Sequence, residues 1–87
     1  MEIHYFAAAR AATGVGLEQI EAPGRQTTLG QVLDNRAACH TGTTDSGLSL
    51  KDILPRCTFL LDGRSAPPET FVGDAERIDV LPPFAGG

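Results

Sequence analysis

The sequence is short of several residue types, and each shortage excludes a class of protein. Its two cysteines, Cys39 and Cys57, are too few for a disulfide framework or for the cluster ligands of a ferredoxin, so a reduced, cytoplasmic protein is expected. Seven basic residues are scattered singly in a chain of net charge −4, which argues against nucleic-acid binding. No apolar run approaches the ~18 residues of a membrane helix, and His4 and Arg10 interrupt the apolar N-terminal segment. Neither a membrane span nor a signal peptide is therefore expected.

Patterns typical of catalytic, metal-binding and cofactor-binding sites are also missing. The stretch "GVGLEQ" (14–19) is an incomplete dinucleotide-binding motif that leads from one expected strand into another rather than into a helix, so we interpret it as a hairpin loop. Cys39-His40, taken with Cys57 and His4, lacks the ligand spacing of a zinc site. No Ser/His/Asp set and no paired carboxylates in an apolar context stand out. We expect no metal, no bound cofactor and no catalytic machinery in this chain.

The N-terminal half predicts a hairpin followed by a helix. Residues 2–7 alternate in polarity as a strand does, and residues 17–22 suit an antiparallel partner, with two glycines between them for the reversal. Thr28 stands three residues before Gln31, which is the spacing of a capping box and marks a helix start. The helix is expected to end near residues 39–42. Its apolar stripe consists of Leu29, Val32, Leu33 and Ala37.

The C-terminal half predicts a surface loop and further strands. Residues 41–49 are small, polar and glycine-containing, and a short helical turn over 50–54 is closed by Pro55. Residues 57–62 form a dense β-type run that ends in an Asp-Gly turn signal. A short edge strand or irregular segment follows, and a last strand is expected within residues 73–81.

This order of elements predicts one small α+β domain. Strands before and after a single main helix give a mixed sheet of four to five strands, with that helix packed across one face. The last strand is expected to pair with the first, which is the β-grasp (ubiquitin-like) arrangement. We assign residues 1–81 to this domain and residues 82–87 to a protruding C-terminal tail.

The ending "LPPFAGG" (81–87) predicts a stiff stem with a thin tip. Pro82 cannot donate to a sheet ladder and Pro82-Pro83 favours polyproline II, so the residues beyond are held away from the body. Phe84, Ala85 and the two glycines could extend ~13 Å. Gly86 and Gly87 have no side chains and could enter a channel too narrow for other residues. The functional group at the tip is an α-carboxylate, so we expect its activation by a partner enzyme.

Three segments, "IHYFAAAR", "LPRCTFLLDG" and "GDAERIDVLPPFAGG", together resemble the MoaD/ThiS family of ubiquitin-like sulfur carriers. The ending is most similar to that of MoaD-type proteins, the small subunits of molybdopterin synthase. The resemblance implies that a MoeB/ThiF-type E1-like enzyme uses ATP to adenylate Gly87, and that a persulfide donor then supplies sulfur for a Gly87 thiocarboxylate. It further implies a MoaE-type large subunit, in a heterotetramer, where sulfur passes to a pterin precursor of the molybdenum cofactor.

Strand alternation predicts a docking surface at the root of the tail. In the first strand Tyr5 is expected to face the helix, which turns Phe6 to the other face. In the last strand Val80 is expected inward and Leu81 outward, and in the third strand Leu60 is expected outward. Phe6, Leu60 and Leu81 would then share one sheet face, the face that family members use for both partners.

Other functions are compatible with the same sequence. A carrier of the same chemistry could serve another pathway, such as thiamine thiazole or cysteine synthesis. A ubiquitin-like modifier could be conjugated to lysines through Gly87; Lys51 is the only lysine of this chain. The simplest alternative is an interaction module whose Gly-Gly ending is accidental.

Overall fold

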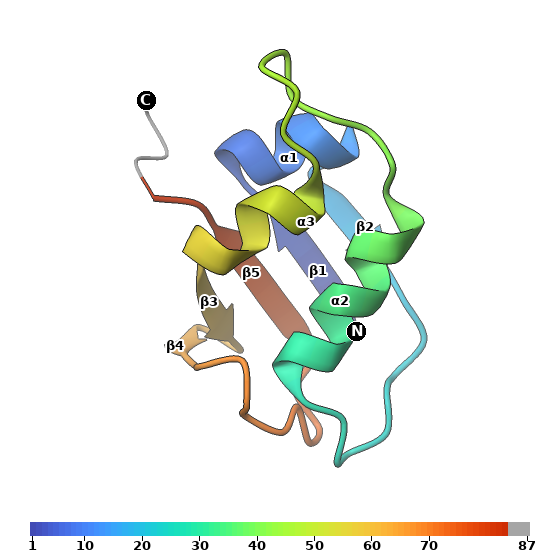
Figure 1. The fold of residues 1–87 in the computed structure, drawn as a ribbon. Helices are drawn as coiled ribbons and strands as arrows, with labels where there is room; N and C mark the ends of the chain where they lie inside the picture. The colour runs from blue at the N-terminus through green and yellow to red at the C-terminus, as the bar shows by residue number, and fades with distance from the viewer. Residues whose placement is uncertain (84–87) are drawn as a thin grey trace.

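The computed structural model describes residues 1–83 and contains a five-stranded sheet in the order β2-β1-β5-β3-β4 (Figure 1). The helices lie on one face of this sheet, and no helix within residues 1–83 is long and apolar enough to cross a membrane. The elements in chain order are β1 (Glu2–Tyr5), α1 (Ala7–Thr13), β2 (Leu17–Gln19), α2 (Leu29–Cys39), α3 (Leu50–Ile53), the 3-10 helix η1 (Leu54–Arg56), β3 (Thr58–Leu61), β4 (Arg64–Ser65) and β5 (Arg77–Leu81).

The predicted α+β class and β-grasp arrangement are confirmed. β1 pairs with β5 in parallel, whereas β1 with β2, β3 with β4 and β3 with β5 pair antiparallel, so the sheet is mixed. The last strand pairs with the first, as expected, and lies at the centre of the sheet. α2 is the main helix and crosses the sheet diagonally (Figure 1).

A helix stands where a plain hairpin was predicted, and that prediction was wrong. β1 ends at Tyr5, and α1 (Ala7–Thr13) then leads to β2, which still pairs antiparallel with β1. The segment is rich in alanine, the best helix former, and it buries Ala9 and Ala12. Gly14 ends the helix in the left-handed conformation at φ 78°, with its N–H bonded to the Arg10 carbonyl.

Two local signals predicted from the sequence, the capping box and the Asp-Gly turn, are present in the structure. The Thr28 hydroxyl accepts from the backbone N–H of Gln31, and the Gln31 side chain accepts from the Thr28 N–H, so the capping box is complete. Asp62 and Gly63 turn between β3 and β4 with φ values of 49° and 83°, which is why a glycine follows the aspartate.

The core lies between the sheet and the helices. The inward residues of the two central strands are at most 1% exposed, which confirms the predicted strand phase. Burying each such aliphatic side chain stabilises the fold by roughly 1.5–3 kcal/mol. These strand residues are Ile3, Tyr5, Ile78 and Val80, and they share one cluster with Leu29 and Leu33 of α2 and Leu50 of α3.

Candidate functional site

The predicted tail begins at the central strand of the sheet. β5 is hydrogen-bonded to β1 on one side and to β3 on the other, so the tail root is firmly held. The strand ends at Leu81, because Pro82 has no N–H to continue the ladder. Pro82 is buried and Pro83 is exposed. The other four predicted tail residues lie outside the described residues: Phe84, Ala85, Gly86 and Gly87.

The sheet face away from the helices, which we call the open face, carries the three residues predicted to bind partners. Leu60 pairs with Asp79, and Leu81 follows two residues later on the same side of β5. Phe6 continues β1 in extended conformation, at φ −119° and ψ 153°, so its side chain points away from that of buried Tyr5. Phe6 is 36% exposed, and Leu60 and Leu81 are half-buried. Their role in partner binding stays a prediction.

Two hydrogen-bonded pairs of ionisable side chains lie on the open face, farther from the tail root. His4 Nε2 and Glu2 Oε1 are 3.0 Å apart on β1, and Arg77 Nε donates to Asp79 Oδ1 at 2.7 Å on β5. The register places Glu2 beside Arg77 and His4 beside Asp79. Acidic and basic groups therefore alternate across the two central strands. Sequence reasoning missed this arrangement, for which the Arg-x-Asp spacing on a central strand was the signal.

A polar cluster on the helix side of the sheet was also missed. The Glu18 carboxylate accepts hydrogen bonds from the Tyr5 hydroxyl at 2.7 Å and from Arg36 at 3.2 Å, and His40 Nε2 lies 3.1 Å away. Burial, followed by the hydrogen bond to Glu18, raises the pKa of Tyr5 above its usual value. The cluster ties β1 and β2 to the C-terminal end of α2, which is a structural role.

The cysteines and histidines lie in different surroundings. His4 lies on the open face, whereas His40 bonds Glu18 on the helix side. Cys39 is exposed, and the Cys57 thiol donates to a backbone carbonyl. Burial raises the pKa of Cys57 to about 11, which keeps the thiol protonated at neutral pH. Within residues 1–83, no three or more side chains of the types that bind metals are gathered.

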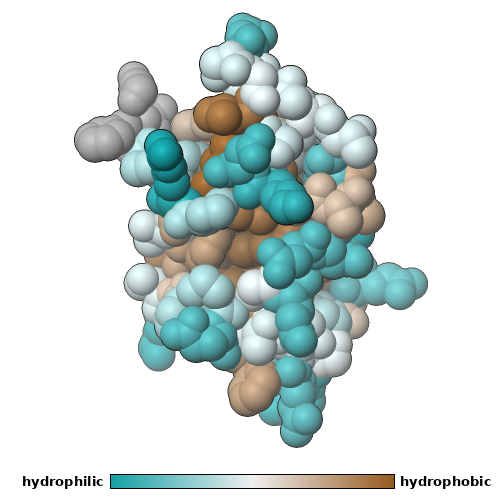
Figure 2. Space-filling view, in the orientation of Figure 1, coloured by the Kyte–Doolittle hydropathy of each residue, from teal (hydrophilic) through white to brown (hydrophobic). Residues whose placement is uncertain are grey.

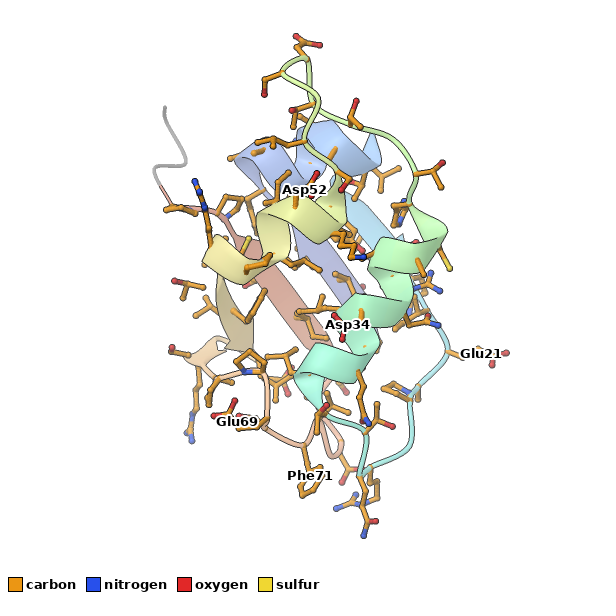
Figure 3. All side chains as sticks on the ribbon, in the orientation of Figure 1. Glu21, Asp34, Asp52, Glu69 and Phe71 are labelled. Atoms are coloured by element: carbon orange, nitrogen blue, oxygen red, sulfur yellow. The ribbon has the colours of Figure 1, made fainter. Side chains whose placement is uncertain are left out.

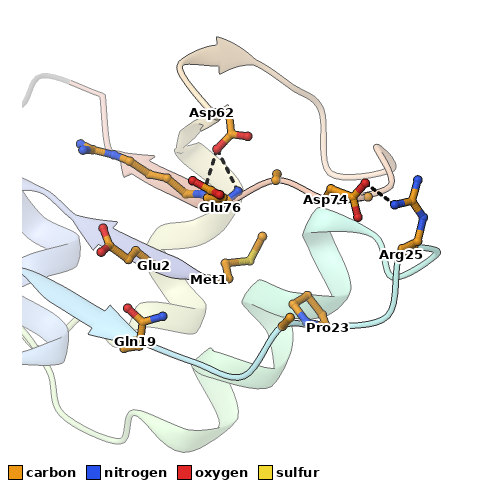
Figure 4. A pocket seen from close by; sticks show the side chains of 12 residues that line it. Met1, Glu2, Gln19, Pro23, Arg25, Asp62, Asp74 and Glu76 are labelled. Atoms are coloured by element: carbon orange, nitrogen blue, oxygen red, sulfur yellow. Dashed lines mark hydrogen bonds and ion pairs between the residues drawn. The ribbon is translucent and has the colours of Figure 1, made fainter.

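A polar hollow of about 860 Å³ lies at the end of the sheet opposite the tail root (Figure 4). Asp62 accepts two hydrogen bonds there, from the backbone N–H groups of Glu76 and Arg77, and Arg25 forms an ion pair with Asp74. These charged groups hold the turns that precede β5, so we assign the residues of this hollow a structural role and not a role in the functional site.

A second hollow is apolar and lies on the helix face. Figure 2 shows apolar side chains gathered between α2 and α3. They line a groove of about 580 Å³ that includes Leu33, Leu54 and Phe59, with Asp34 and Lys51 among its polar residues. Lys51, the only lysine of the chain, is exposed there. The groove lies on the helix face rather than on the open face, so we do not include it in the site.

A family model decides the identity of the chain. The model described as the ThiS family matches residues 3–87. The chain belongs to the ThiS family. Members are small ubiquitin-like sulfur carriers without catalytic machinery of their own, and membership implies an E1-like adenylating enzyme as partner.

Two solved structures share the fold of this ThiS-family chain. The crystal structure of SAMP1 from Haloferax volcanii is 22% identical, covers 100% of this chain and 98% of its own, and has a TM-score of 0.72. A crystal structure of H. volcanii small archaeal modifier protein 1 is 20% identical, covers 95% of each chain and has a TM-score of 0.71. At these identities the likeness supports the fold alone. No curated protein matches the chain significantly.

Proposed function

We propose that this ThiS-family protein is the sulfur-carrying small subunit of molybdopterin synthase and works from the carboxylate of Gly87. The observation that carries the proposal is the ending "LPPFAGG", whose leucine is the last residue of the central strand. Pro82 and Pro83 supply a stiff exit from the domain, and Gly86 and Gly87 supply a tip that fits a narrow channel. Phe84 and Ala85 complete the tail, which the proposal treats as a unit separate from the domain of residues 1–81.

The proposed chemistry divides one hard substitution into easier steps. The Gly87 carboxylate attacks the α-phosphate of ATP in the E1-like enzyme and pyrophosphate leaves, so the acyl carbon gains AMP as a good leaving group. The terminal sulfur of a persulfide attacks this carbon and AMP departs. A thiol then cleaves the S–S bond, which leaves the thiocarboxylate on Gly87. ATP and all transition-state stabilisation belong to the partner, and the carrier supplies position.

The proposed partners are of three kinds. A MoeB/ThiF-type enzyme adenylates Gly87, a persulfide donor supplies sulfur, and a MoaE-type large subunit, in a heterotetramer, takes sulfur to the pterin precursor. Phe6, Leu60 and Leu81 on the open face are proposed as docking residues, because an apolar surface beside the tail root would aim the tail into the partner. A reduced cytoplasmic location belongs to the same proposal, since both cysteines are free.

A protein modifier is the second candidate function. It is favoured by the name of the structural neighbour, small archaeal modifier protein 1, although the likeness to that protein is one of fold. In a modifier, the adenylated Gly87 would form an amide bond with a lysine amine instead of receiving sulfur. A carrier for thiamine thiazole or cysteine synthesis would share the thiocarboxylate and differ only in the acceptor of sulfur.

Intact mass spectrometry separates these functions. The full chain is incubated with ATP, a MoeB/ThiF-type enzyme from the same genome and a persulfide donor. The proposal also requires that the mature chain ends at Gly87, which the starting mass tests. Exchange of one carboxylate oxygen for sulfur supports a carrier, whereas a stable lysine adduct supports the modifier. Sulfur transfer to a pterin precursor with a MoaE-type subunit, and none with a thiazole synthase, would identify the pathway.

Deletion of Gly87 is the matched control. It moves the carboxylate back by ~3.5 Å and out of reach of the adenylating site, while the fold is expected to melt at the same temperature. ATP–pyrophosphate exchange should therefore disappear. Normal exchange with the truncated protein would contradict the proposed role of Gly87.

A further inference from the structure

Asp79 is a buried carboxylate on the open face, which no helix of residues 1–83 covers. It lies on the central strand and is 7% exposed, the only charged residue in the buried class within residues 1–83. Its neighbours on the open face are His4 of β1 and Leu60 of β3. Burying a carboxylate costs several kcal/mol unless it is paired, so this position needs a cation.

That cation is Arg77, and it is bound in a way that leaves most of its donors free. Its Nε donates to Asp79 Oδ1 at 2.7 Å, while the side chain is 45% exposed. Within residues 1–83 no acceptor is hydrogen-bonded to either Nη of Arg77. A guanidinium held by Nε still presents N–H groups on both Nη atoms in a planar fork, which matches the two oxygens of a carboxylate.

The acidic residue beside Arg77 on β1 is engaged elsewhere. Glu2 stands beside Arg77 in the β1–β5 register, but its Oε1 lies 3.0 Å from His4 Nε2. His4 therefore holds Glu2 on β1, and the Arg77 side chain stays 45% exposed at the edge of the polar hollow. Besides its apolar residues, the open face thus presents the guanidinium of Arg77, held in place by Asp79.

We propose that Arg77, oriented by Asp79, binds a carboxylate side chain of the E1-like adenylating enzyme when that enzyme docks on the open face. The inference rests on the proposed function, because it takes the enzyme that acts on Gly87 as the occupant of the face. Charge complementarity identifies the group, since an exposed guanidinium fork selects a paired-oxygen anion. Asp79 acts as a positioning residue.

The ATP phosphates are not the anion in question. Arg77 begins β5 and Leu81 ends it, so the two are separated by about 13 Å at the rise of a strand. In the proposed function ATP reacts at Gly87, which lies beyond Leu81 in the chain, so the reacting phosphates belong to the other end of β5. A protein carboxylate on the docking surface fits the position.

ATP–pyrophosphate exchange by the MoeB/ThiF-type enzyme, titrated with the carrier, tests this inference. For Arg77→Ala we expect the carrier concentration at half-maximal exchange to rise at least about tenfold, with the maximal rate within about twofold, because an ion pair outside the reacting centre contributes to binding. Arg77→Lys should give an intermediate rise, since an ammonium keeps the charge but loses the fork. Asp79→Asn should raise the half-maximal concentration about threefold, as Arg77 stays but is less ordered.

Arg64→Ala is the control, because Arg64 is an exposed arginine of β4 that pairs with inward-facing Leu61 rather than with the open face. It should titrate as wild type. Added salt should raise the half-maximal concentration more for wild type than for Arg77→Ala, a response that a merely structural role would not produce.

The outcomes separate the inference from the proposed function. Exchange by wild type together with wild-type titration by Arg77→Ala would overturn the inference alone. A loss of maximal rate with unchanged half-maximal concentration would also overturn it. If Arg77→Ala unfolds because Asp79 is left unpaired, the Arg77→Lys variant provides the test. A half-maximal carrier concentration equal to that of wild type for Arg77→Lys would then refute the inference. No exchange with wild type would overturn the proposed function, and the inference with it.

Discussion

The Tyr5 hydroxyl donates a 2.7 Å hydrogen bond to the Glu18 carboxylate and so links β1 to β2 on the helix side of the sheet. The same carboxylate accepts from Arg36, and His40 Nε2 lies within bonding distance. One acidic side chain therefore joins the edge strand, its neighbour and the end of the main helix. This arrangement makes the stability of the fold depend on the ionisation of Glu18.

Glu18→Gln should remove a pH-dependent part of that stability. Burial acts to raise the pKa of Glu18, but the hydrogen bonds from Tyr5 and His40 and the charges of His40 and Arg36 together lower it. A carboxyl group whose pKa is lower in the folded state than in the unfolded state stabilises the fold when it is ionised. This contribution is fully present above the unfolded-state pKa of 4.5, and it is lost as the pH falls through the lower, folded-state pKa. Urea denaturation of both proteins from neutral to acidic pH measures the difference.

The wild type should be more stable than the variant at neutral pH, and the gap should narrow in acid. Tyr5→Phe is a suitable companion, because it removes one hydrogen bond and should cost about 1 kcal/mol while Glu18 stays ionisable. A difference between wild type and Glu18→Gln that is the same at every pH would contradict this account.

Thr28→Ala should destabilise the fold by about 1 kcal/mol through loss of the helix cap. The Thr28 hydroxyl accepts from the Gln31 N–H at 3.1 Å, and the side-chain oxygen of Gln31 accepts from the Thr28 N–H at 2.8 Å. Gln31→Ala should cost less, and the double variant less than the sum, because the two bonds belong to one motif. Thermal unfolding measures all three, with Thr41→Ala in the exposed loop as control. An additive double variant would show that the two bonds act independently.

The capping box could be predicted from the sequence, whereas α1 and the bond from Tyr5 to Glu18 could not. The capping box and the alternation of β1 and β5 are local, so Thr28, Ile3 and Val80 could be placed from spacing alone. α1 was missed because an alanine-rich run shows neither strand alternation nor a polar face, and its helix is recognised chiefly by propensity. The bond from Tyr5 to Glu18 joins residues whose meeting depends on that missed helix, and no spacing rule predicts it.

Phe6→Ala and Leu81→Ala should weaken binding of the large subunit by about 1–3 kcal/mol while changing fold stability little. Both residues lie on the open face beside the tail root, so truncation removes apolar contact area that the partner would cover. Phe71→Ala is the matched control, because Phe71 is 61% exposed and projects at the end of the molecule opposite the C-terminal end of β5 (Figure 3). Calorimetric titration, paired with denaturant melts, provides the measurement. Unchanged affinity, or a loss accounted for by unfolding, would place these side chains outside the interface.

Gly86→Val tests whether the tip of the tail must be thin, and it rests on the proposed function. Gly86 lies outside the described residues, so the expectation comes from its chemistry. Valine adds a Cβ and two methyl groups and restricts the backbone, yet it leaves the Gly87 carboxylate the same number of bonds from the sheet. We expect the unfolding temperature to stay unchanged and ATP–pyrophosphate exchange to fall at least about tenfold, because a displacement of the reacting group by about 1 Å is enough for such a loss.

Gly86→Ala separates the two effects that valine combines. Alanine adds only the Cβ, so a channel of limited width predicts an intermediate loss of exchange, between wild type and Gly86→Val. The Cβ already removes glycine's access to positive φ, so if backbone freedom alone mattered, alanine and valine would lose exchange to a similar extent. If both variants are adenylated and accept sulfur at nearly wild-type rates, the partner's channel is wide and the paired glycines are not required for the chemistry proposed here.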